Sequence, residues 1–184
     1  MPETRLERAL SRWRVRSGPA ALILILVFAR PRPASLLLCC ALGLAGLVVR
    51  AWASGHLHKD KKLAVSGPYR FTRNPLYLGN LLLGLGLVLG ARTWPALAVF
   101  AVYFLIFYTA AVLRERRRMK ELFPDDYADY RRSVPLFFPS LRRAAAASPV
   151  RFSGRLYLKN KEYRALAGFA AVGLLLLARM LLLG

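Results

Sequence analysis

The sequence has few cysteine, histidine or acidic residues. Its two cysteines, Cys39 and Cys40, are adjacent in an apolar stretch, where small buried or lipid-facing side chains are expected rather than a disulfide. His56 and His58 are too closely spaced to share one helix face, and no cluster of Cys or acidic residues joins them. We therefore expect neither a disulfide framework nor a metal site. No small-residue cleavage site follows the first apolar stretch, so we expect no cleavable signal peptide.

Acidic side chains are also scarce relative to basic ones. Nine Asp and Glu stand against 29 Lys and Arg, which gives a formal net charge of +20, yet 57% of the residues are hydrophobic. A soluble core cannot accommodate both extremes, whereas a membrane protein places apolar residues against lipid and charged residues in its loops. Nucleic-acid binding is the alternative explanation of the charge, but membrane topology already accounts for it.

The apolar residues form five stretches with few charges. They cover residues 19–29, 34–49, 75–91, 94–113 and 165–183. The last two approach the ~20 residues that a helix needs to cross a bilayer. Residues 19–29 are the weakest stretch: they span the membrane only if neighbours near Val15 and Arg30 extend the helix, and otherwise they form part of a shorter helical hairpin. The sequence predicts an all-α integral membrane protein with about five transmembrane helices.

The basic residues alternate between the two sides that five crossings would define. Five precede the first stretch, six lie between the second and third, and fourteen lie between the fourth and fifth, whereas four fall on the other side. Cytoplasmic loops carry the excess of Lys and Arg. We therefore expect a cytoplasmic N-terminus, with the long loops on the cytoplasmic side. Anionic lipid headgroups would be attracted to this surface.

Two polar clusters interrupt the apolar background. The first, residues 66–79, combines a turn with the start of a helix, whose free backbone N–H groups favour an anion, and Gly79, Gly84 and Gly86 reduce the bulk of that helix. Close helix packing explains the same glycines. The second cluster comprises residues 114–115 and 122–135, where Glu115 is either a ligand for a cation or a solvated partner of a neighbouring arginine. The residues alone predict a cytoplasmic pocket but no reaction.

In these clusters the chain resembles the isoprenylcysteine carboxyl methyltransferase and phospholipid methyltransferase superfamily of membrane enzymes. The resemblance covers residues 50–139, within a single membrane domain over residues 1–184, and leaves a linker and a C-terminal transmembrane helix at 140–184. It rests on the ordered motifs Gly-Pro-Tyr at 67–69, Arg-Asn-Pro at 73–75, Tyr-Leu-Gly at 77–79, Glu115, Phe-Pro-x-x-Tyr-x-x-Tyr at 123–130, and Val-Pro at 134–135. Asn74 stands where many members have His, Arg116 where many have Glu, and Pro124 where Gly is usual.

The resemblance implies a site for S-adenosylmethionine and methyl transfer to a lipophilic acceptor, an isoprenoid or a lipid. It implies catalytic roles for Arg73, Glu115 and Arg131. It implies a cofactor site formed by Tyr69, Asn74, Pro75, Tyr77, Gly79, Gly84, Gly86, Glu115, Tyr127 and Tyr130. An NADPH-dependent reductase of sterol-like lipids and a non-catalytic membrane protein are the alternatives. The acceptor group stays open between a carboxylate and an amine, with His56 as the one candidate base.

Overall fold

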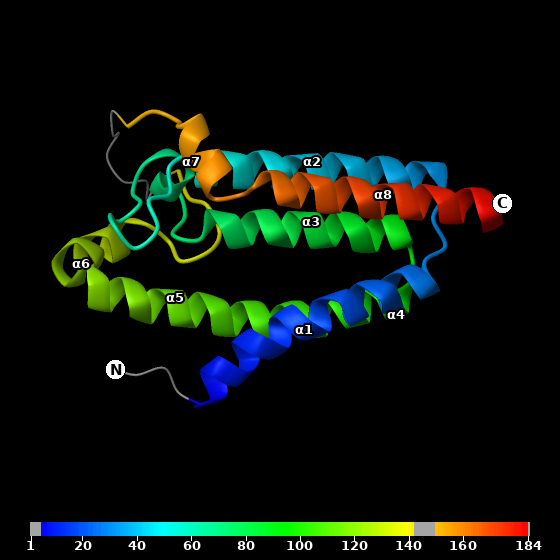
Figure 1. The fold of residues 1–184 in the computed structure, drawn as a ribbon, viewed down its shortest axis with the longest axis horizontal. Helices are drawn as coiled ribbons and strands as arrows, with labels where there is room; N and C mark the ends of the chain where they lie inside the picture. Colours follow the sequence, from blue (N-terminus) through cyan, green and yellow to red (C-terminus); the bar gives the residue numbers. More distant parts are fainter. Residues whose placement is uncertain (1–4, 142–149, 184) are drawn as a thin grey trace.

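The computed structural model describes residues 5–141 and 150–183, and every regular element in them is a helix (Figure 1). The predicted all-α class is therefore confirmed. The elements are α1 (Arg5–Phe28), α2 (Pro33–Ser54), the 3₁₀ turn η1 (Gly67–Arg70), α3 (Pro75–Ala91), α4 (Trp94–Tyr103), the π-helix η2 (Phe104–Tyr108), α5 (Thr109–Leu122), α6 (Pro124–Ser133), α7 (Gly154–Lys159) and α8 (Tyr163–Leu183).

Three of these helical segments are long and apolar enough to cross a membrane: Pro33–Ser54, Trp94–Leu122 and Tyr163–Leu182. Helix α3 is apolar but shorter. Helix α1 extends well before the predicted stretch, because its first half is a basic helical segment that continues through Pro19 into the apolar half. The predicted count of five spans stays a prediction.

The helices form two layers (Figure 1). Helices α2, α3 and α8 lie side by side in one layer, and α1 lies with the continuous rod of α4, η2 and α5 in the other. The short connections 29–32 and 92–93 lie at one end of the molecule, together with the C-terminal end of α8. The long connections, η1, α6 and α7 lie at the opposite end, which we call the loop end. The basic segments that were predicted to share one side of the membrane, where the structure describes them, thus lie together at the loop end.

Prolines and glycines define the helix boundaries and the closest contact. Pro33, Pro75 and Pro124 each stand in the first turn of a helix, where a missing backbone N–H costs nothing. Between α2 and α3, a Cβ atom added to Gly46 would lie 2.7 Å from the Gly79 carbonyl oxygen, and one added to Gly79 would lie 2.8 Å from that of Gly46. The two backbones therefore approach closely, as small residues allow in membranes.

Two buried clusters hold the ends of the bundle together. One, near the short connections, consists of Ile25, Ala29, Cys39, Ala91, Ala96 and Leu176 with partly buried neighbours. At the same end, the Arg179 guanidinium of α8 donates hydrogen bonds to the Ala29 and Val27 carbonyls, where α1 ends. The other cluster, at the loop end, consists of Leu63, Tyr127, Tyr130 and Val134. This second cluster fixes α6 against the 57–65 loop.

Candidate functional site

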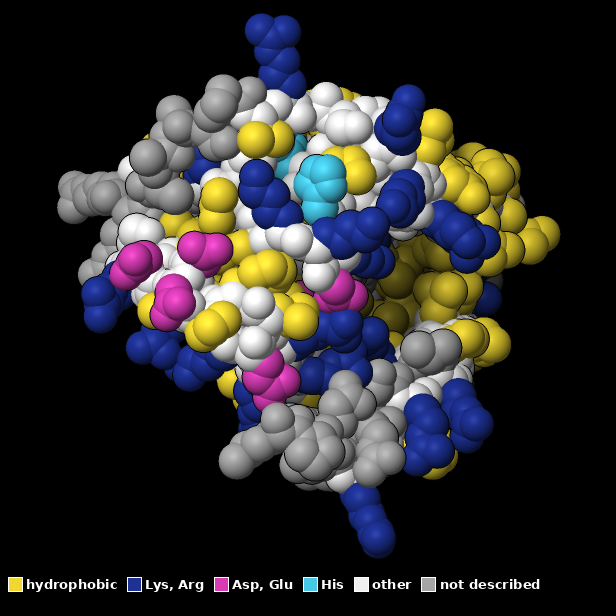
Figure 2. Space-filling view, turned by 60° about the vertical axis from the view of Figure 1, so that its left-hand side comes forward, with side chains coloured by type: hydrophobic (Ala, Val, Ile, Leu, Met, Phe, Trp, Pro, Cys, Tyr) yellow, Lys and Arg dark blue, Asp and Glu magenta, His cyan; other side chains and the backbone are white. Residues whose placement is uncertain are grey.

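A cavity of about 710 Å³ opens at the loop end. That volume lies within the range of roughly 300–1,000 Å³ that is typical of small-molecule sites. Figure 2 shows a hollow at this end of the molecule, with hydrophobic side chains inside it and Lys and Arg along its rims. The cavity is lined by residues of α1, α2, α3, the α4–α5 rod, α6 and the 57–64 loop, with Glu162 from the segment that precedes α8.

Both sequence clusters contribute to this one cavity. The first supplies Tyr69, Arg73, Asn74, Pro75 and Tyr77, and the second supplies Glu115, Tyr127 and Tyr130. Direct hydrogen bonds join them: the Tyr130 hydroxyl donates to the Tyr69 carbonyl at 2.6 Å, and Arg73 Nη1 donates to the Tyr127 hydroxyl at 3.1 Å. Residues about 60 positions apart are thus held as one unit.

The segment after α6 fastens the first cluster in place. The Arg73 backbone N–H donates to the Pro135 carbonyl at 3.0 Å, the Asn74 side-chain amide to that of Leu136 at 2.8 Å, and the Thr72 hydroxyl to that of Phe137 at 2.6 Å. This segment is non-helical and is hydrogen-bonded to residues 71–74. Asn74 therefore uses its amide N–H to order the wall of the cavity.

Two tyrosines of the wall are nearly inaccessible to water. Tyr69 is 7% exposed and Tyr130 is 6% exposed. Burial, and to a lesser degree the neighbouring Tyr130, raises the pKa of Tyr69. Burial likewise raises the pKa of Tyr130. Removal from water disfavours the charged phenolate. Both hydroxyls therefore stay protonated at neutral pH and can act through hydrogen bonds only.

The charges around the cavity are mainly positive. The cationic lining residues are Arg14, Arg50, Lys59, Lys62, Arg73, Arg116 and Arg118, and the acidic ones are Asp60, Glu115 and Glu162. Arg118 and Asp60 form an ion pair at 2.7 Å that is about half exposed. The Nε atom of Arg73 is buried and has no hydrogen-bond partner among the described residues. A cleft lined by one sign of charge attracts ligands of the other sign, here an anionic group.

A π-helix provides an aromatic part of the wall. In η2 each turn holds more residues than in an α-helix, so Tyr103 and Tyr108 both line the cavity although they are five positions apart. The Tyr108 ring stacks on Phe104, with centroids 4.4 Å apart, and forms a T-shaped pair with Tyr77, with centroids 5.8 Å apart. Leu105 and Ile106 of the same turn are exposed. This turn thus separates the cavity from the outer surface of the rod.

Four of the predicted site residues do not line the cavity. Gly79 makes room for the Arg50 side chain, Gly84 faces the Phe100 ring, and a Cβ atom on Gly86 would lie 3.0 Å from the Cys39 carbonyl oxygen. The structure thus accounts for the three glycines by helix packing. Arg131 is exposed on α6. For all four, the predicted role in catalysis or cofactor binding stays a prediction.

The candidate base His56 also lies outside the cavity wall. It is 5% exposed, and its Nδ1 atom hydrogen-bonds the Ser66 hydroxyl at 2.9 Å. Gly67 has a φ of +58°, and a Cβ atom there would lie 2.5 Å from the imidazole ring. Burial lowers the pKa of His56. The imidazole supports the turn that leads into η1, and the exposed His58 lines the cavity in its place.

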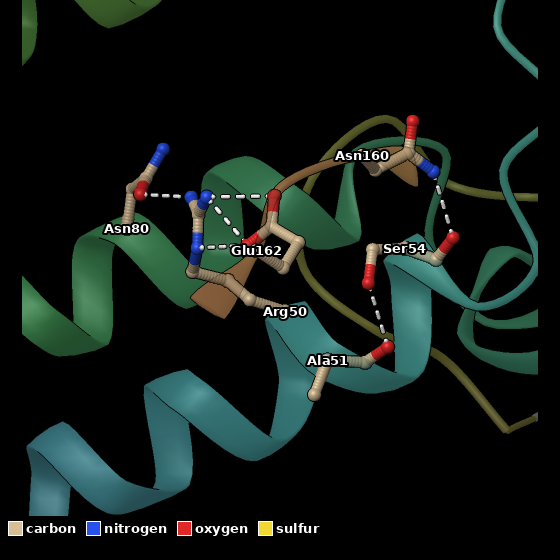
Figure 3. Close-up of polar contacts among 6 residues, drawn as sticks. All are labelled: Arg50, Ala51, Ser54, Asn80, Asn160 and Glu162. Atoms are coloured by element: carbon tan, nitrogen blue, oxygen red, sulfur yellow. Dashed lines mark hydrogen bonds and ion pairs between the residues drawn. The ribbon is translucent and has the colours of Figure 1, made fainter. Parts of the chain in front are cut away.

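Sequence reasoning missed an ion pair in the wall (Figure 3). Arg50 of α2 donates through Nε and Nη2 to the Glu162 carboxylate at 3.0 and 2.9 Å, and through Nη1 to the Asn80 side-chain oxygen. Glu162 lies 112 positions from Arg50, just before α8. No local pattern could have linked the two. The only signal was the position of Arg50, a charge directly after an apolar stretch.

Comparison with known proteins agrees with these motifs. A family model described as phospholipid methyltransferase matches residues 34–126. The chain is 37% identical over 110 residues to the cobalt-zinc-cadmium resistance protein CzcN of Cupriavidus metallidurans, covering 56% of this chain and 50% of that protein. It is 32% identical over 96 residues to the nickel-cobalt-cadmium resistance protein NccN of Alcaligenes xylosoxydans xylosoxydans, covering 51% of this chain and 45% of that protein.

A third relative is the protein-S-isoprenylcysteine O-methyltransferase of Schizosaccharomyces pombe, which is 27% identical over 82 residues, or 45% of this chain and 35% of that protein. The chain thus matches half or less of the length of each of these relatives. No solved structure gives a significant match. The predicted superfamily is confirmed, because the family match covers half of the sequence and includes the first motif cluster and Glu115. The chain belongs to the phospholipid methyltransferase family.

Proposed function

We propose that this protein transfers a methyl group from S-adenosylmethionine to a lipophilic acceptor at the cytoplasmic face of a membrane. The observation that carries the proposal is the convergence of both motif clusters on one cavity beside apolar helices. A water-soluble cofactor and a lipid-soluble acceptor can meet only where such a cavity borders the bilayer. The excess of basic residues in the segments at the loop end supports a cytoplasmic orientation.

The residues of the cavity fit the chemistry of the cofactor. S-adenosylmethionine has a carboxylate, two cationic centres and an adenosine group. The unpartnered Nε of Arg73 would pair with the carboxylate, and the Glu115 carboxylate would face a cationic centre. Tyr69, Asn74, Pro75, Tyr77, Tyr127 and Tyr130 would enclose the remainder. The cofactor supplies an electrophilic methyl group, so the task of the protein is to hold cofactor and acceptor in line.

The wall favours an acceptor that is ionised before it binds. A carboxylate with a pKa near ~4 is charged at neutral pH, whereas an alkylamine with a pKa near ~10 must first lose a proton. His56 supports a turn outside the cavity, and the hydroxyls of Tyr69 and Tyr130 stay protonated. The basic excess of the wall suits an anionic acceptor equally well. We therefore infer that methyl transfer proceeds without His56 as its base.

The metal-resistance names of two relatives do not lead us to propose a metal site here. Among the residues that the structure describes, no group of three or more His, Cys, Asp or Glu side chains could hold a metal ion. The other candidates are an NADPH-dependent membrane reductase and a non-catalytic member of the family.

A direct binding comparison tests the proposal. Calorimetry of the purified chain in detergent should show saturable binding of S-adenosylhomocysteine and none of NADPH. Incubation with methyl-labelled S-adenosylmethionine and a membrane lipid extract should then label an organic-soluble product. Binding of NADPH in place of S-adenosylhomocysteine would overturn the proposal in favour of a reductase. Binding of neither would indicate a non-catalytic protein.

A further inference from the structure

The segment just before α8 contributes a charged side chain to the cavity wall. Glu162 accepts two hydrogen bonds from Arg50, at 3.0 and 2.9 Å, and a third close contact joins Arg50 Nη2 to Glu162 Oε2 at 2.8 Å. The Arg50 side chain is 16% exposed and that of Glu162 is 10% exposed. Such a forked, largely buried pair is among the stronger charge contacts that a protein makes. Both residues line the cavity.

The chain from Ser153 to Glu162, which leads into α8, is also fixed to the end of α2 and to the 57–65 loop by contacts that do not involve the ion pair. Figure 3 shows Asn160 beside Ser54, whose carbonyl accepts a hydrogen bond from the Asn160 amide at 2.9 Å; the Leu57 carbonyl accepts another at 3.1 Å. Ser153 donates its backbone N–H to the Gly55 carbonyl at 3.0 Å. The docking of this segment therefore does not depend on the ion pair alone, and its effect can be separated from that of Glu162.

The ion pair also determines where the Arg50 charge lies. The stem of Arg50 passes over Gly79, the one glycine of the Tyr-Leu-Gly motif, and its guanidinium is held between Asn80 and Glu162 (Figure 3). In this position the charge of Arg50 is balanced by that of Glu162. Without Glu162, a largely buried guanidinium would be left uncompensated beside a cavity that is already rich in basic groups.

We propose that Glu162 is a positioning residue of the cofactor site. It holds Arg50 and Asn80 as a fixed, electrically neutral wall, so that an anionic group in the cavity is directed to Arg73 and not to Arg50. The segment before α8, which lies beyond the family match at 34–126, is then part of the site. This inference rests on the proposed methyltransferase function for the identity of the ligand.

The test compares Glu162→Gln with Asn160→Ala, which removes hydrogen bonds of the same segment that do not involve the ion pair. Glu162→Gln should weaken S-adenosylhomocysteine binding by about tenfold or more, because the uncompensated Arg50 then competes with Arg73 for the anionic group. Asn160→Ala should lower thermal stability but leave that affinity within about twofold, because Asn160 does not line the cavity. Sulfate should stabilise Glu162→Gln against heat more than it stabilises the wild type, because Arg50 is then free to bind an anion.

In Glu162→Gln, the uncompensated buried charge of Arg50 could prevent folding, and the double variant Arg50→Gln with Glu162→Gln removes that charge. It should fold, lose the added sulfate effect and still bind S-adenosylhomocysteine more weakly than the wild type. Suppose that S-adenosylhomocysteine binds equally well to the wild type, to Glu162→Gln and to the double variant. The positioning role is then wrong, and the proposed function is unaffected. If the wild type does not bind the cofactor analogue, the proposed function fails. The effect of Glu162 on Arg50 is then tested by sulfate alone. Equal stabilisation of Glu162→Gln and the wild type by sulfate would show that the positioning role is wrong too.

Discussion

Replacement of Gly79 by alanine should damage both the fold and the site. An added Cβ atom would lie 2.5 Å from Arg50 Cγ and 2.8 Å from the Gly46 carbonyl oxygen. Ordinary carbon contacts begin near ~3.5 Å, so Arg50 Cγ has to move by about 1 Å, and the carbonyl oxygen, which is also too close, has to move as well. The carbonyl belongs to the backbone of α2, and the head of Arg50 is held by Glu162 and Asn80. Neither neighbour can move without disturbing the α2–α3 contact.

The expected cost is about 1–3 kcal/mol of unfolding free energy, the range for overpacking a tightly packed interior. Gly168→Ala is the matched control, because nothing lies within 4 Å of a Cβ atom added there in α8. That change should be neutral or stabilising by up to about 1 kcal/mol, because alanine favours a helix over glycine. Reversible unfolding in mixed detergent micelles measures both variants.

Binding of S-adenosylhomocysteine supplies the second measurement. Gly79→Ala displaces Arg50 and should weaken binding, whereas Gly168→Ala should not. Equal stability of Gly79→Ala and wild type would show that α2 and α3 are not in close backbone contact. Such a result would contradict the packing explanation of the glycine as well as the geometry of the ion pair.

Three further predictions concern the wall, the turn before η1 and the topology. Glu115→Ala and Asn74→Ala should each weaken S-adenosylhomocysteine binding by about 1–3 kcal/mol in calorimetry, and normal binding by both folded variants would contradict their proposed roles. Burial lowers the pKa of His56 below its ordinary value of 6.5, so its contribution to stability should be complete above that pH and decline below it. Thermal unfolding from about pH 7 to pH 5 should show this decline, and a decline of the same size in His56→Gln would assign it to other groups. Reporter fusions after Arg70 and after Arg92 should report the cytoplasm and the opposite side respectively, and a shared side would contradict the predicted orientation.

The helices were largely predictable because membrane helices require long apolar stretches. Residues 75–91 coincide with α3, and the charged residues after the fourth stretch continue its helix as part of α5. The three-residue spacing of Tyr127 and Tyr130 places both on one face of α6, and both are buried. Helix α1 begins earlier than its apolar residues indicate, because basic residues can continue a helix outside the apolar region.

The sequence motifs indicated which residues lie together, but not the contacts that depend on the tertiary fold. Tyr69, Arg73, Asn74 and Glu115, which the resemblance assigns to one site, line one cavity, and their roles in binding and catalysis stay predictions. The π-helix left no signature in the sequence of residues 104–108, because apolar residues fill its turn whichever way the backbone winds. Asp125–Arg132 was predictable as a polar segment, but the exposure of Arg131 depends on how α6 packs.

The wide sequence separation within the wall has a consequence for how the protein is made. Helices α2 and α3 leave the ribosome well before the segment before α8, since 112 positions separate Arg50 from Glu162. Domains are generally completed in the order of their synthesis. Until the segment before α8 has been made, Arg50 has no carboxylate partner from it and one wall of the cavity is incomplete. A chain interrupted before residue 162 would therefore reach the membrane without that part of the wall.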